Sequence, residues 1–185
     1  AYLLSISARL LGMSILVPLF EELFIRSLML RALANAKRTG LGVIQFIHDL
    51  PGVGDLVMDT KIGTHAGKLP PIFTEEFRRH RVGVVTWFGI AASTFVFMLS
   101  HMPRDWPGCI ACGVVWCLMV RWTNPAAAKH GADPPGEADG SKQDDLERSR
   151  PLPGDRGLGP VIWSHGLVNA LLWGYVIFTG DWRFL

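Results

Sequence analysis

The stretch Pro18-Leu19-Phe20-Glu21-Glu22-Leu23-Phe24-Ile25-Arg26 decides the fold of this chain. It places two carboxylates and a guanidinium inside an apolar run from Ile15 to Leu30, as in a membrane-embedded helix. A charge at the bilayer centre costs roughly 3 kcal/mol on insertion scales, so such a cluster predicts a functional site. Glu22 and Arg26 are i,i+4 neighbours that can pair, whereas Glu21 lies about 100° further round the helix and is free to face another element.

The composition indicates a small membrane protein with several spans. The chain has 185 residues, of which 49% are hydrophobic, and its charges collect in two blocks, 37–81 and 121–156. A soluble domain with one core spreads its charges over the whole surface. The net charge of +2 is too small to indicate a nucleic-acid partner. The chain begins at Ala1 inside an apolar stretch without a signal-peptide pattern, and we expect it to be a piece of a longer protein with further spans upstream.

Four apolar segments predict the helices. Residues 1–35 form one long helix kinked at Pro18 or two helices that meet there, because proline removes a backbone donor. Val82–Ser100 contains no charge and is the clearest span. Trp106–Val120 is a shorter apolar helix, with Trp106, Trp116 and Trp122 as expected interfacial anchors. Pro160–Thr179 is the last span. We therefore expect an all-α, multi-pass transmembrane bundle of about four to five helices, forming a single domain over residues 1–185.

Two polar insertions, at about 37–81 and 123–159, interrupt this bundle. The second is rich in Pro, Gly, Asp and Glu, and we expect it to be disordered or loosely ordered. Four histidines fall in these insertions and are expected to be solvated, without a role: His48, His65, His80 and His130. A hairpin of the two central helices places both insertions on one side, which the positive-inside rule makes cytoplasmic.

Several polar residues in the apolar segments have both a structural and a functional interpretation. The Glu21–Arg26 cluster is an interfacial helix end or a site that faces a water-accessible cavity. His101, four residues after Phe97, is a residue at a helix end or part of that site. His165 and Asn169 share a helix face and either hydrogen-bond between helices or act chemically. The remaining candidates have a spacing known from metal and redox motifs but are better explained as small buried residues: Cys109, Cys112 and Cys117.

Depth along the helices predicts which of these residues meet. Glu21 lies ten residues from Arg31 and Asn169 lies nine residues from Pro160, so both are roughly 15 Å deep. His101 lies near the far end of its helix. It reaches the same layer only if that helix starts lower, tilts, or ends within the membrane.

The three motifs in this order resemble the CPBP family, which comprises the CAAX proteases and bacteriocin-processing enzymes and is also called the Abi family. That family carries EExxxR, FxxxH and HxxxN or HxxxD on separate transmembrane helices. Here they are Glu21-Glu22-Leu23-Phe24-Ile25-Arg26, Phe97-Met98-Leu99-Ser100-His101 and His165-Gly166-Leu167-Val168-Asn169. The segment 169–185 also resembles bacterial members of the CAAX-protease-related branch, which implies an inner-membrane location. Ser27 replaces the usual glycine, and both insertions are longer than expected.

The resemblance implies an intramembrane endopeptidase that acts on a membrane-associated substrate, for example a prenylated or lipid-anchored one, in the lipid bilayer. By resemblance, Glu21 is the general base on a water that His101 orients, and His165 and Asn169 stabilise the oxyanion. Glu22 and Arg26 form a supporting pair. The family is also described as metal-dependent in places, which leaves open a divalent metal such as zinc with Glu21, His101 and His165 as ligands.

Three other functions are alternatives for this sequence. The first is a catalytically inactive membrane scaffold or self-immunity protein of the same fold. The second is a proton- or ion-coupled transporter, which the absence of a repeat in the sequence argues against. The third is a membrane di-metal oxidase, whose expected histidine-rich clusters are missing from the sequence.

Overall fold

The computed structural model describes residues 2–34, 48–49, 52–57, 59–68, 80–131 and 152–182. These residues form helices and turns, and no strand occurs among them. The all-helical part of the predicted fold class is therefore confirmed. Expectations for most of the first insertion and for the middle of the second lie outside the described residues.

The N-terminal segment is one continuous helical run, as in the first of the two predicted alternatives. Its parts are α1 (Tyr2–Leu11), the π-helical η1 (Gly12–Leu16), α2 (Val17–Glu21), the π-helical η2 (Glu22–Met29) and α3 (Leu30–Ala32). The widened turns of η1 directly precede Pro18, which has no backbone N–H to donate. The N–H of Val17 bonds five residues back, to the carbonyl of Gly12. The π-helical turns therefore change the hydrogen-bond pattern next to the proline, and the helix continues through it.

The central segment is a helical hairpin of α8 (Trp87–Leu99), the 3₁₀ turn η5 (Pro103–Asp105) and α9 (Trp106–Thr123). The prediction of a helix over Val82–Ser100 is wrong at its start. The Thr86 hydroxyl accepts a hydrogen bond from the Gly89 N–H at 3.1 Å and caps the helix there. The 13 residues of α8 are about 20 Å long, short of the roughly 30 Å hydrocarbon core.

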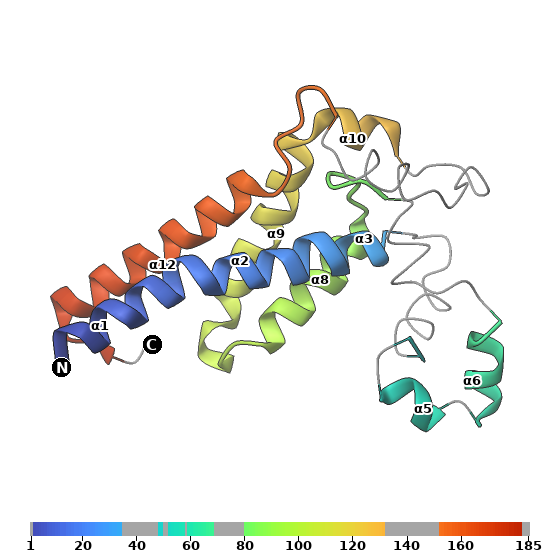
Figure 1. Ribbon diagram of the computed structural model, residues 1–185, viewed down its shortest axis with the longest axis horizontal. Coiled ribbons are helices and arrows are strands. Elements are labelled where there is room, and N and C mark those ends of the chain that lie inside the picture. Colours follow the sequence, from blue (N-terminus) through green and yellow to red (C-terminus); the bar gives the residue numbers. More distant parts are fainter. Residues whose placement is uncertain are drawn as a thin grey trace.

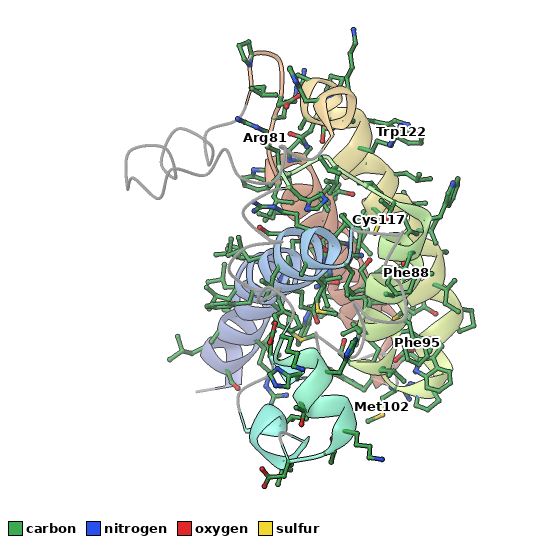
Figure 2. All side chains as sticks on the ribbon, turned by 90° about the vertical axis from the view of Figure 1, so that its right-hand side faces the viewer. Arg81, Phe88, Phe95, Met102, Cys117 and Trp122 are labelled. Atoms are coloured by element: carbon green, nitrogen blue, oxygen red, sulfur yellow. The ribbon has the colours of Figure 1, made fainter. Side chains whose placement is uncertain are left out.

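The two helices of the hairpin approach closely. A Cβ added at Gly113 of α9 would lie 2.8 Å from Cγ2 of Thr94 on α8. Four residues further along α9, the sulfur of Cys117 lies 3.4 Å from the Ser93 hydroxyl. Cys117 is buried inside the hairpin, whereas Phe95 and Met102 are exposed along its outer side (Figure 2).

The C-terminal helix α12 (Gly159–Thr179) runs antiparallel to the N-terminal run, along η1 and α2 (Figure 1). The helix predicted over Pro160–Thr179 is confirmed and begins one residue earlier. A Cβ added at Gly166 would lie 2.4 Å from the carbonyl oxygen of Ser14. Only glycine therefore permits this helix crossing. The crossing brings the histidine of the third motif against the carboxylates of the first.

Both polar insertions contain short ordered segments, and at the described ends of the second this differs from the expectation of disorder. The first contains α5 (Val53–Val57) and α6 (Lys61–Ala66). The second begins with α10 (Pro125–His130), whose Ala126 and Ala127 N–H groups donate to the carboxylate of Asp155 at 2.9 and 3.0 Å. One loop histidine is also not solvated: His80 is 5% exposed, and its carbonyl accepts a hydrogen bond from Arg31 Nε.

Two helical segments among the described residues are long and apolar enough to cross a membrane, Pro103–Thr123 and Gly159–Thr179. Only 28% of the most apolar part of each is buried by the rest of the protein. Several of their other apolar side chains are exposed, among them Val115, Trp163 and Leu171, unlike those of a mostly buried core helix in a soluble domain. The predicted bundle of four to five spans is not confirmed.

Candidate functional site

A buried cluster of charges forms where α12 passes the junction of α2 and η2. His165 Nδ1 lies 2.9 Å from Glu22 Oε1, although the two residues are 143 positions apart. The other Glu22 oxygen lies 3.5 Å from Arg26 Nε, so the i,i+4 pair expected from the sequence is present. The Glu22 and Arg26 side chains are 0% exposed and that of His165 is 3% exposed. Because isolated buried charges cost several kcal/mol each, the three must compensate one another.

Glu21 lies beside the other ring nitrogen of the same imidazole. Its Oε2 lies 3.5 Å from His165 Nε2, and its side chain remains 25% exposed. Since Nδ1 of His165 donates to Glu22, the proton at Nε2 decides the charge state of the Glu21–His165 pair. A proton between Glu21 Oε2 and His165 Nε2 can reside on either atom. Glu21 is therefore the accessible member of a pair that can exchange one proton.

Aromatic rings replace hydrogen-bond acceptors around Arg26. Its guanidinium carbon lies 4.9 Å from the ring centre of Phe97 and 5.6 Å from that of Trp116. Neither terminal nitrogen of this arginine has a hydrogen-bond partner among the described residues. The rings offer their negative faces to the cation, which offsets part of its desolvation.

Trp116 is a residue of the site that the sequence analysis missed. It was expected to be an interfacial anchor, but it is 3% exposed. Its indole stacks on the His165 imidazole with ring centres 4.1 Å apart and planes at 27°. The indole N–H donates to the Ser164 hydroxyl at 3.2 Å. The spacing to Cys109, Gly113 and Cys117 could have placed it on the packed face of α9.

His101 lies at the same site, two residues beyond the end of α8. Its ring is 4.6 Å from that of Phe97, which in turn meets the His165 ring edge-on at 5.9 Å. It also interacts electrostatically with Glu21. His101 Nδ1 lies 2.8 Å from the Phe97 carbonyl, which can only accept, so Nδ1 carries the proton. In the neutral imidazole, Nε2 is then left as an acceptor.

Asn169 lies away from the carboxylates. Its Nδ2 donates to the Met13 carbonyl at 2.8 Å. That carbonyl lies in η1, where Val17 bonds to Gly12 instead and Pro18 cannot donate. Asn169 therefore supplies the donor that the Met13 carbonyl does not receive from Val17 or Pro18. The expectation that Asn169 shares the layer of Glu21 is wrong, because His165 occupies that level on α12.

The three cysteines are free thiols, and Cys109 and Cys117 are buried. Their small side chains allow α8 and α9 to approach. This agrees with their interpretation as structural residues.

The donor set does not fit a metal ion. Among the described residues, no group of three or more histidine, cysteine or acidic side chains is placed to hold one. Both nitrogens of His165 face carboxylates, and Nδ1 of His101 is engaged with a carbonyl. The expected ligands Glu21, His101 and His165 thus contact one another or the backbone.

No protein-family model, no curated protein and no solved structure matches this chain.

Proposed function

We propose that this chain is an integral membrane protein of the CPBP type that hydrolyses a peptide bond in a membrane-associated substrate. The observation that carries this function is the convergence of Glu21, Glu22, Arg26, His101 and His165 from three helical segments. Buried ionisable groups among lipid-facing helices are costly, and a site that uses them is the usual explanation. The charged insertions lie on the cytoplasmic side.

Glu21 is the general base of the proposed reaction. It is the only carboxylate of the cluster that is partly exposed, so a water can reach it. Glu21 takes a proton from this water as the water oxygen attacks the carbonyl carbon of the scissile peptide. The proton then passes to the leaving nitrogen as the C–N bond breaks. Proton transfer by a positioned carboxylate contributes about 10²–10⁴-fold to such reactions.

The two histidines hold the other reacting groups. His101 accepts a hydrogen bond from the attacking water at Nε2, because its Nδ1–H is committed to the Phe97 carbonyl. His165, held by Glu22 at Nδ1, donates from Nε2 to the oxyanion of the tetrahedral intermediate. Asn169 supports the reaction by fixing the crossing of α12 on η1.

A catalytically inactive scaffold of the same fold is the second candidate. It is favoured by one observation: Glu22, Arg26 and His165 are almost fully buried and compensate one another. Such a cluster also stabilises a helix crossing without chemistry. The partly exposed carboxylate of Glu21 separates the candidates, since a packing role does not need a carboxylate that water can reach.

Cleavage by purified protein in proteoliposomes tests the proposal. One substrate carries a prenylated C-terminal cysteine and the other is a transmembrane peptide, and products are identified by mass spectrometry. We expect cleavage of at least one substrate and its loss in Glu21→Ala, His101→Ala and His165→Ala. Failure of the folded wild type to cleave either substrate favours the scaffold, and full activity of Glu21→Ala refutes the mechanism.

A further inference from the structure

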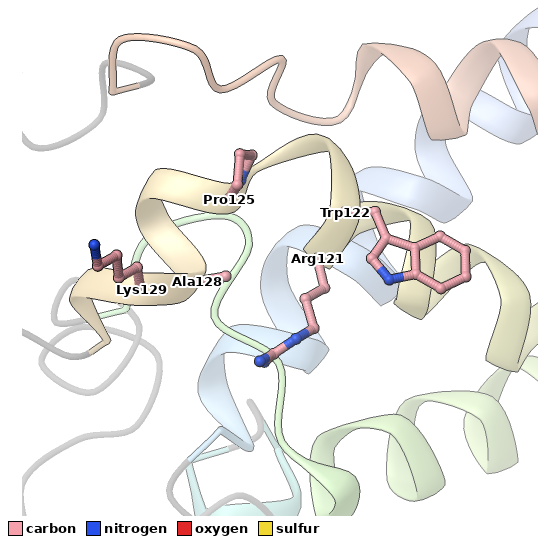
Figure 3. A pocket seen from close by; sticks show the side chains of 5 residues that line it. All are labelled: Arg121, Trp122, Pro125, Ala128 and Lys129. Carbon is pink, nitrogen blue, oxygen red and sulfur yellow. The ribbon is translucent and has the colours of Figure 1, made fainter.

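An open hollow lies where α9 ends and α10 begins. It is lined by Arg121, Trp122, Pro125, Ala128 and Lys129 and has a volume of about 430 Å³ (Figure 3). This volume is within the range of small-molecule sites. The hollow is separate from the charge cluster, and neither the motifs nor the proposed reaction uses it.

The walls of the hollow are fixed by a buried corner. Asn124, between the two helices, accepts from the Gly157 N–H at 2.7 Å and donates to the Gly157 carbonyl at 2.9 Å. Asp155 bonds the first N–H groups of α10. These contacts join the end of α9 to the start of α12 and set the direction of α10. Figure 3 shows Arg121 on the last turn of α9 and Lys129 on α10, with Ala128 between them.

The hollow is cationic. Its lining has a guanidinium and an ammonium, and no described acidic residue belongs to it. Arg121 Nη1 makes a long hydrogen bond of 3.4 Å to the Val85 carbonyl, which orients the side chain. The nearby carboxylate of Asp155 already accepts two hydrogen bonds from α10. A guanidinium and an ammonium on one opening suit a phosphate group.

The position of the hollow indicates which kind of phosphate it meets. Arg121 and Trp122 belong to the last turn of the apolar segment Pro103–Thr123. The Trp122 indole is 69% exposed, and the 81% exposed Trp87 begins the neighbouring α8. Exposed tryptophans at helix ends mark the level of lipid headgroups. A phosphate at this level matches the headgroup of a lipid.

We propose that this hollow binds the phosphate of an anionic phospholipid, with Arg121 and Lys129 as its ligands and Trp122 beside the glycerol and upper acyl region. The site rests on the membrane placement proposed above and is independent of peptide hydrolysis. Its failure and that of the proteolytic function are therefore distinguishable.

The test is lipid retention by the full chain. Wild-type protein in micelles receives equal amounts of phosphatidylglycerol and phosphatidylcholine, and native mass spectrometry measures which lipid stays bound. We expect phosphatidylglycerol to be preferred. The preference should fall about 30-fold in the Arg121→Gln/Lys129→Gln variant, which corresponds to about 2 kcal/mol for two cations near an anionic headgroup.

The matched control is Lys61→Gln/Lys68→Gln, which removes two exposed charges from another part of the chain. It should keep the preference. Equal retention of both lipids by the wild type, or equal losses in the two double variants, overturns the site. A second arm adds glycerol phosphate without acyl chains. If this soluble anion binds as tightly as the lipid and depends on the same two residues, the lipid assignment is wrong.

Discussion

Replacing Gly166 by alanine tests the helix crossing on which the whole site depends. The added Cβ would lie 2.4 Å from the Ser14 carbonyl oxygen, whereas real Cβ contacts are almost never closer than 3.0 Å. The obstacle is backbone, so α12 must move away from η1. Overpacking of this kind costs about 1–3 kcal/mol. Alanine returns about 1 kcal/mol of helix propensity, so we expect a net loss of up to about 2 kcal/mol.

Gly174→Ala on the same helix is the matched control, because a Cβ there meets nothing within 4 Å. The assay is thermal unfolding of both variants in the same detergent. We expect Gly166→Ala to unfold at a lower temperature than the wild type, and Gly174→Ala at the same or a higher one. Equal stability of the two variants would show that α12 does not cross η1 at this residue.

Two further substitutions probe the buried polar contacts. Glu22→Ala leaves His165 and Arg26 buried without their carboxylate, so we expect a loss of about 3–5 kcal/mol in denaturant unfolding. Glu21→Ala at the partly exposed position should cost clearly less, and equal losses would contradict the assigned burial. Asn169→Ala removes the donor to the Met13 carbonyl and should cost about 1–3 kcal/mol. Thr179→Ala removes an exposed hydrogen bond on the same helix and should have little effect; if it costs as much, the Met13 contact is unimportant.

The sequence predicted the elements better than their depths. The charged stretch at Glu21, the pairing of Glu22 with Arg26 and the last helix all follow from local spacing. The start of α8 at Trp87 was missed because hydropathy does not register the cap by Thr86. Counting from helix ends paired Glu21 with Asn169. The close crossing at Gly166 and the π turns before Pro18 instead bring His165 to that level.

The role of Trp116 could not be predicted from its residue type. Tryptophan in an apolar helix is often interfacial, and only the packing of α9 against α12 turns this one onto His165. The ordered ends of the second insertion were also hidden, because they depend on Asn124 and Asp155 contacting residues about 30 positions away. Contacts of this range leave no periodic pattern in the sequence.

The most direct test of the proposed chemistry is the rate of peptide cleavage by Glu21→Gln, measured in ¹⁸O-labelled water. Glutamine keeps the shape of the side chain and removes the base, while Asp59→Asn is the control at an exposed acid. We predict one labelled oxygen in the new carboxylate of the wild-type product, a rate about 10²–10⁴-fold lower for Glu21→Gln, and no change for Asp59→Asn. Cleavage by Glu21→Gln at the wild-type rate would contradict the assignment of Glu21 as the base.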